Sequence, residues 1–214
     1  MPSLGMSLAE NALSGAFKSV NPFSKDRESN GINWGNYNYP PFFGIVHYDF
    51  DDIKHEEIQR IVLNIHRVFL ISVGACLLNM LDNVIDASFY EGAKWTWVVY
   101  SCLNLLLIPP ISLYIFYTGF KGLALSDSSL LQRYSIMATI QAIFLFLFTA
   151  MPFGAMNGLL SFAMYNVRWY WIFAVIAESS LWIAAFALCV HSVVFVVRRD
   201  YNALPLATRT SVPK

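Results

Sequence analysis

The chain has 214 residues, of which 57% are apolar and only 13% are charged, with 14 basic and 14 acidic side chains. A soluble domain carries about 25% charged residues, so this chain lacks the polar surface that a globular protein in water needs. Intrinsic disorder requires low hydrophobicity and high net charge, and a nucleic-acid binder usually has a basic surface. The composition excludes both classes and indicates a membrane protein.

Residues 1–50 are rich in Gly, Ser, Asn and Pro, and this composition predicts a flexible tail. The tail contains one Asn-Pro-Phe sequence, in which a short Asn-Pro turn exposes an aromatic side chain. Such a side chain is suited to a small pocket on a partner protein. We therefore expect a peptide motif formed by Asn21, Pro22 and Phe23.

The end of the tail combines two prolines with aromatic residues. Prolines hold the backbone extended and supply no amide donor, so the neighbouring rings can bury only against a membrane surface or a helix end. The pattern predicts a membrane-interface block, with a partner-binding peptide as the alternative. The block consists of Tyr39, Pro40, Pro41, Phe42 and Phe43.

Residues 51–67 predict an amphipathic helix next to the membrane. Acidic residues suit its first turn, and apolar residues recur at i, i+3, i+4 and i+7 spacing from Ile58 to Phe69. The helix either lies on the cytoplasmic leaflet before the chain turns in or extends the first span into the cytosol. The basic residues expected to face lipid are Lys54, Arg60 and Arg67, together with Lys121 further along the chain.

Four apolar stretches between residues 68 and 197 are long enough to cross a bilayer, which requires about 20 residues in helical form. They are residues 68–85, 95–117, 134–156 and 169–197. Because the connections are short, neighbouring helices must run antiparallel. The sequence therefore predicts an all-α membrane protein, an antiparallel bundle of four transmembrane helices, followed by a C-terminal tail at residues 198–214.

An even number of spans places both ends of the chain on one side of the membrane. Twelve of the 14 basic residues lie on that side, against Lys94 and Arg168 on the other. Because the side richer in Lys and Arg is the cytoplasmic one, we expect both tails and the middle loop, residues 118–133, to be cytosolic.

The order of these features resembles the secretory carrier membrane proteins (SCAMPs), which have an Asn-Pro-Phe tail, an aromatic Pro-Pro-Phe block, an amphipathic segment and four spans. The most specific similarity is Asn38–Asp49, which resembles the family's Asn-Trp-Pro-Pro-Phe-Phe-Pro-Ile-Ile-His-His-Asp block. Shorter similarities follow at Gln59-Arg60, Ile108-Pro109-Pro110 and Asp127-Ser128.

The resemblance implies a short, non-enzymatic tetraspan protein of Golgi, trans-Golgi, endosomal, secretory-vesicle or plasma membranes. Its role would lie in exocytosis, endocytosis and recycling, through membrane association and adaptor recruitment. The resemblance also implies that Asn21, Pro22 and Phe23 bind an EH-domain endocytic adaptor. The family's middle loop is basic and binds phosphoinositides, but here it contains only Lys121 and Arg133, fewer than the 4–8 basic residues that capture anionic lipid.

One acidic residue lies inside the fourth span. Glu178 follows Trp169 by nine residues, which at about 1.5 Å per residue places it near the bilayer midplane. An ionisable group there is a functional hypothesis by default, and a small channel or proton-linked carrier would use it. The alternative that we favour is a structural hydrogen bond between helices, for which Asn104 and Gln141 are available on other spans.

The sequence contains no recognisable catalytic arrangement, phosphate-binding glycine loop or metal-ligand spacing. We therefore expect no enzyme activity, no cofactor and no metal site. The expected partners are the lipid bilayer, an EH-domain adaptor and a second copy of the chain, with no nucleic acid. An accessory subunit of a larger membrane complex is a further alternative.

Overall fold

The computed structural model describes residues 32–89, 95–152, 155–164 and 169–203. The chain divides into two compact units, one ending at Asp52 and one beginning at Ile53. The elements, in chain order, are the 3-10 helix η1 (Phe50–Asp52) and the helices α2 (Glu56–Phe89), α3 (Trp95–Leu125), α4 (Ser128–Ala150), α5 (Ser161–Met164) and α6 (Trp169–Ala203).

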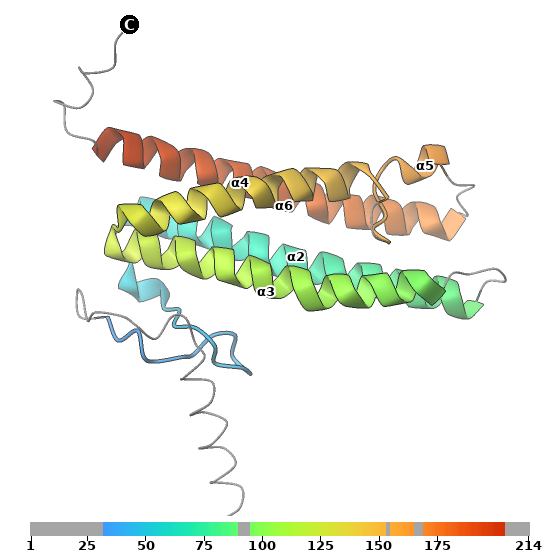
Figure 1. Cartoon of the computed structure of the whole chain (residues 1–214), viewed down its shortest axis with the longest axis horizontal. Helices are drawn as coiled ribbons and strands as arrows, with labels where there is room; N and C mark the ends of the chain where they lie inside the picture. Colours follow the sequence, from blue (N-terminus) through green and yellow to red (C-terminus); the bar gives the residue numbers. More distant parts are fainter. Residues whose placement is uncertain (1–31, 90–94, 153–154, 165–168, 204–214) are drawn as a thin grey trace, which may run out of the picture. The chain divides into compact units, whose positions relative to one another are not determined.

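The second unit is a bundle of four long helices, each long and apolar enough to cross a membrane. α2 packs against α3 and α6, and α4 packs against the same two helices, so the ring order is α2, α3, α4, α6 (Figure 1). Neighbouring helices in this ring run in opposite directions. The structure thus confirms the predicted fold class, an all-α membrane protein with four transmembrane helices in an antiparallel bundle.

The two longest helices, α2 and α6, exceed the length that a bilayer requires. α2 has 34 residues and α6 has 35, which at 1.5 Å per residue gives each a length of about 50 Å. The hydrocarbon core is about 30 Å thick, so parts of both helices extend beyond it. We call the end of the bundle where α2 begins and α6 ends the terminal end.

The amphipathic segment predicted at residues 51–67 is not a separate helix. Residues 50–52 form the short helix η1, and α2 then runs without interruption from Glu56 to Phe89. The side-chain amide of Gln59 donates to the carbonyl of Ile53 at 2.6 Å, which ties the entering chain to the first turns of α2. Of the two alternatives, the structure has the one in which this segment extends the first span.

The middle loop predicted at residues 118–133 is almost entirely helical, which corrects the sequence interpretation. α3 continues to Leu125 and α4 begins at Ser128, so only Ser126 and Asp127 connect them. Asp127 caps α4, because its carboxylate accepts hydrogen bonds from the backbone amides of the second and third residues of that helix. Small and polar residues that resemble a loop in the sequence therefore belong to a helix.

Proline shapes two of the spans in different ways. α3 continues through Pro109 and Pro110. α4 ends at Ala150 rather than at residue 156, because Met151 precedes Pro152 and takes an extended conformation with φ −111° and ψ 141°. A residue before proline is disfavoured in the helical region, and this restriction stops the third span.

Glycine permits α3 to approach its neighbours closely. A Cβ atom at Gly119 would lie 2.7 Å from Cδ2 of Tyr134 on α4 and 3.2 Å from Cδ1 of Ile65 on α2. Tyr134 is 1% exposed, so its ring has little room to move away. At Gly74 on α2, by contrast, an added Cβ would meet no heavy atom within 4 Å.

These contacts predict opposite effects for two glycine-to-alanine substitutions. Gly119→Ala overpacks the bundle, at a cost of about 1–3 kcal/mol that exceeds the gain in helix propensity of up to about 1 kcal/mol. Gly74→Ala keeps that gain without a clash. Thermal unfolding in detergent, followed by circular dichroism, should show a lower melting temperature for Gly119→Ala and an unchanged or higher one for Gly74→Ala. Equal shifts would contradict close packing at Gly119.

Candidate functional site

Within the tail predicted at residues 1–50, the structure describes residues 32–50, and residues 38–48 of these form a hairpin. Tyr39 and Val46 form an antiparallel bridge in which each backbone amide donates to the other's carbonyl, at 2.9 and 2.8 Å. The amides of Phe43 and Gly44 both donate to the carbonyl of Pro40 at 2.9 Å and close the turn. Gly44 has φ +52°, a value that glycine adopts without steric cost.

Polar and aromatic contacts hold the base of the hairpin together. Asn38 and Tyr48 form a reciprocal pair, in which the Asn38 amide donates to the Tyr48 carbonyl and the Tyr48 amide donates back to Asn38 Oδ1. The rings of Tyr39 and Tyr48 meet edge to face at 5.3 Å. Burial, together with the neighbouring Tyr48, raises the pKa of Tyr39 to about 12, so this phenol stays neutral. His47 Nε2 lies 2.7 Å from Asp52 Oδ2.

The hairpin presents two aromatic side chains at its tip. Phe42 is 96% exposed and Phe43 is 77% exposed, whereas Tyr39 and Pro40, the first residues of the predicted block, are partly buried at the base. Large apolar side chains gathered on an exposed turn mark an interaction surface. The predicted membrane-interface block is therefore an ordered turn with Pro41, Phe42 and Phe43 outermost.

The Asn-Pro-Phe motif, Asn21, Pro22 and Phe23, lies outside the described residues. Its role stays a prediction from the sequence.

Inside the bundle, Glu178 is fully buried and its carboxylate accepts four hydrogen bonds. Oε2 accepts from the side-chain amides of Asn79 on α2 at 3.1 Å and Asn157 at 2.8 Å. Oε1 accepts from the backbone amide of Asn157 at 3.2 Å and from the indole N–H of Trp182 at 3.1 Å. A carboxylate has about four acceptor positions, so the protein itself occupies all of them.

The segment after α4 folds back to supply two of these four donors. The amides of Leu159 and Leu160 donate to the carbonyls of Thr149 and Ala150, reversing the chain direction. The Ala155 carbonyl accepts from the side-chain amides of Asn79 at 2.6 Å and Asn83 at 3.2 Å, and Ser179 donates to the Asn157 carbonyl at 3.1 Å. A Cβ at Gly158 would lie 2.5 Å from the Met151 backbone, so the reversal requires glycine there.

The sequence predicts an interhelical hydrogen bond for Glu178, but the structure supplies different partners. The amide of Gln141 instead donates to Ser112 on α3 at 2.5 Å. The residues that sequence reasoning missed are Asn79, Asn83, Asn157 and Trp182. Two asparagines four residues apart within the first span were a usable signal, because buried amides inside a membrane require partners.

Three of the four basic residues expected to face lipid are exposed, and the fourth is not. Lys54, Arg60 and Arg67 lie on the surface, and Arg60 forms an exposed pair with Glu56 at 2.5 Å. Lys121 is only 8% exposed and its ammonium lies 6.0 Å from the centre of the Tyr117 ring. The expectation for Lys121 is wrong because α3 stays helical through this stretch and is buried from Ile115 to Leu123.

Four apolar helices that pack around a buried polar cluster define a four-span membrane protein. The sequence matches the SCAMP family over residues 36–203, which is most of the chain and includes both the hairpin and the bundle. The chain belongs to the SCAMP family, and the family suggests a membrane-trafficking protein. Compared with curated proteins and with solved structures, the chain matches none.

The Glu178 cluster predicts a graded loss of stability. Glu178→Leu leaves four buried donors without their acceptor, at about 1–3 kcal/mol each, whereas Glu178→Gln retains one oxygen acceptor and should be intermediate. Ser180→Ala is the matched control, since Ser180 is exposed and donates only to Ile176 of its own helix. Melting temperatures in detergent should follow the order Ser180→Ala, Glu178→Gln, Glu178→Leu from highest to lowest. Wild-type stability of Glu178→Leu would contradict a structural role for the carboxylate.

Proposed function

We propose that this chain is a tetraspan protein of vesicle membranes that acts in post-Golgi and endosomal traffic by membrane association and adaptor recruitment. The family match over residues 36–203 carries the proposal. The four apolar helices support residence in a bilayer. The hydrogen bonds that occupy the Glu178 carboxylate support a structural role for it in preference to a carrier site.

The distribution of basic residues supports cytosolic tails. Exposed arginines at the terminal end include Arg60 and Arg67 on α2 and Arg198 on α6. This end also contains the beginning of α4, where Arg133 is exposed. Because positive charge accumulates on the cytoplasmic side, we place the terminal end there, within reach of cytosolic adaptors.

The aromatic tip of the hairpin supports membrane association beyond the four spans. Phe42 and Phe43 are the most exposed large apolar residues of the described part of the first unit. Burying one such side chain in an apolar medium contributes about 1.5–3 kcal/mol. In our proposal the tip inserts these two rings into the lipid interface, with the bridge between Tyr39 and Val46 holding the turn in shape.

Spin labels can measure the depth of this tip. In a background lacking the native cysteines, Phe42→Cys or Phe43→Cys is labelled in the full chain and reconstituted into liposomes. We expect collisions with lipid-soluble oxygen to exceed those with a water-soluble nickel complex at both positions. Asp51→Cys, on an exposed residue of the same unit, should show the reverse. A water-exposed signal at all three positions would refute insertion of the tip.

Adaptor recruitment has its own test in the N-terminal tail. Phe23→Ala removes the aromatic anchor of the Asn-Pro-Phe motif, and Phe17→Ala removes a phenylalanine of the same tail that lacks the preceding Asn-Pro. We expect Phe23→Ala to reduce capture of a purified EH domain by about tenfold or more, the usual effect of losing a central anchor, and Phe17→Ala to leave it unchanged.

In cells, the tagged chain should label Golgi, endosomal or vesicle membranes, and stable mitochondrial residence would overturn the proposal.

A further inference from the structure

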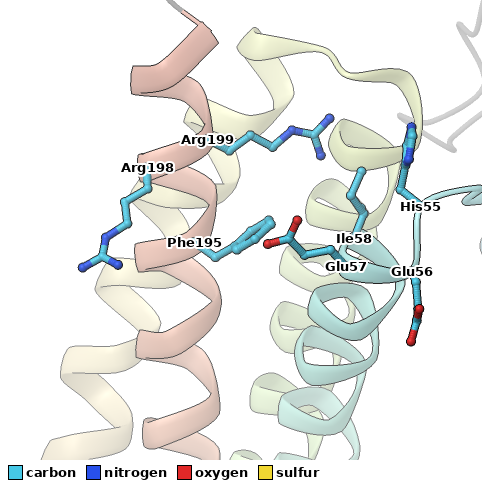
Figure 2. A pocket seen from close by; sticks show the side chains of 7 residues that line it. All are labelled: His55, Glu56, Glu57, Ile58, Phe195, Arg198 and Arg199. Atoms are coloured by element: carbon cyan, nitrogen blue, oxygen red, sulfur yellow. The ribbon is translucent and has the colours of Figure 1, made fainter.

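A groove between α2 and α6 opens at the terminal end of the bundle. It consists of two neighbouring cavities of about 600 and 530 Å³, and both are lined by Glu57 and Phe195. The larger cavity is shown in Figure 2. It is lined by His55, Glu56, Glu57, Ile58, Phe195, Arg198 and Arg199.

With the apolar parts of α2 and α6 in the hydrocarbon core, the groove at their charged ends would lie toward the lipid headgroups. Its residues belong to the first turns of α2 and the last turns of α6, which extend past the hydrocarbon core because each helix is about 50 Å long. Charged side chains gather here, whereas the apolar parts of the same helices begin further in. A ligand in this groove would therefore meet charge near the water and apolar surface toward the membrane.

Two opposite charges face the larger cavity from its two walls. Figure 2 shows Glu57 of α2 and Arg199 of α6 directed into the space between the helices, while Glu56 and Arg198 point away from it. Glu56 pairs with Arg60. Within the part of the chain that the structure describes, Glu57 makes no ion pair.

Arg199 has a donor that the described residues leave unused. Its Nη2 donates to the hydroxyl of Ser126 at 3.3 Å. Its Nη1 is buried and has no hydrogen-bond partner among the residues described. Arg199 itself lines the cavity, and a guanidinium group binds phosphate well.

We propose that this cavity binds the headgroup of phosphatidylethanolamine. The phosphate accepts from Arg199, and the primary ammonium donates to the Glu57 carboxylate across the cavity. Phe195 and Ile58 supply apolar surface for the glycerol and the upper acyl carbons. The two charged side chains that face the cavity, Glu57 and Arg199, have opposite charges, as do the ammonium and the phosphate of this headgroup.

The same lining disfavours the other common headgroups. Phosphatidylcholine has a quaternary ammonium that cannot donate a hydrogen bond to Glu57. Phosphatidylglycerol has no cation for it, and phosphatidylserine adds a carboxylate next to it. The site therefore discriminates between headgroups in two ways. The matching lipid makes favourable contacts, and the other lipids leave the Glu57 carboxylate without a donor or place a negative charge beside it.

Native mass spectrometry of the delipidated full chain tests this site. The four phospholipids, with identical acyl chains, are titrated separately. We expect phosphatidylethanolamine to bind about tenfold more tightly than each of the others, the effect of one charge-assisted hydrogen bond. Binding of any of the others with equal affinity would overturn the proposal. Equal binding of water-soluble phosphoethanolamine would overturn the assignment to a lipid.

Neighbouring residues provide matched control variants. Glu57→Gln and Arg199→Gln should each reduce phosphatidylethanolamine binding to the level of phosphatidylcholine, whereas Glu56→Gln and Arg198→Gln should retain the preference. Arg199→Lys keeps the cation and should retain part of it, and this variant decides the outcome if Arg199→Gln does not fold. If both pairs of variants lost the same amount of phosphatidylethanolamine binding, the binding would depend on overall charge, and a defined site would be refuted.

Discussion

The buried carboxylate of Glu178 fixes the arrangement of three parts of the bundle. A carboxylate in an apolar interior is tolerated only where donors satisfy it, and no single neighbouring helix supplies four. The chain meets this requirement by folding the segment after α4 back into the bundle, so that Asn157 reaches Glu178 while the carbonyl of Ala155 accepts from α2. α2, α6 and the segment after α4 are thereby held together around one acceptor.

The position of a polar residue along α2 and α6 determines whether it joins the two helices or lines the groove between them. Near Glu178 the two helices are joined by a hydrogen bond from Asn79, and the charge is enclosed. At the terminal end the same helices diverge around Glu57 and Arg199, which form no ion pair with each other. Glu57 is exposed there, so water and headgroups solvate its charge. The helix pair therefore combines a closed structural contact with an open groove.

Hydropathy predicted the boundary of a span well where the helix begins at the first residue of its apolar stretch. The predicted second and fourth spans begin at Trp95 and Trp169, and so do α3 and α6. Hydropathy failed between residues 118 and 133. Gly119 there allows α3 to pack closely against α2 and α4, and a single sequence does not show such a packing role. Hydropathy also missed Asn79 and Asn157, since their importance arises from contacts between residues far apart in the chain.

The charge pattern of the groove argues for selection among lipids and against general attraction to an anionic surface. A site built only for anionic headgroups would surround its arginines with further cations, as polybasic segments do. Here Glu57 lines both cavities, next to Arg60 and Arg67 in one and Arg199 in the other. A carboxylate in that position repels every headgroup that lacks a cation, so it reduces nonspecific lipid binding. Phosphatidylethanolamine, whose ammonium can donate to the carboxylate, still binds. Lipid recognition by this chain thus depends on a negative residue as much as on its positive ones.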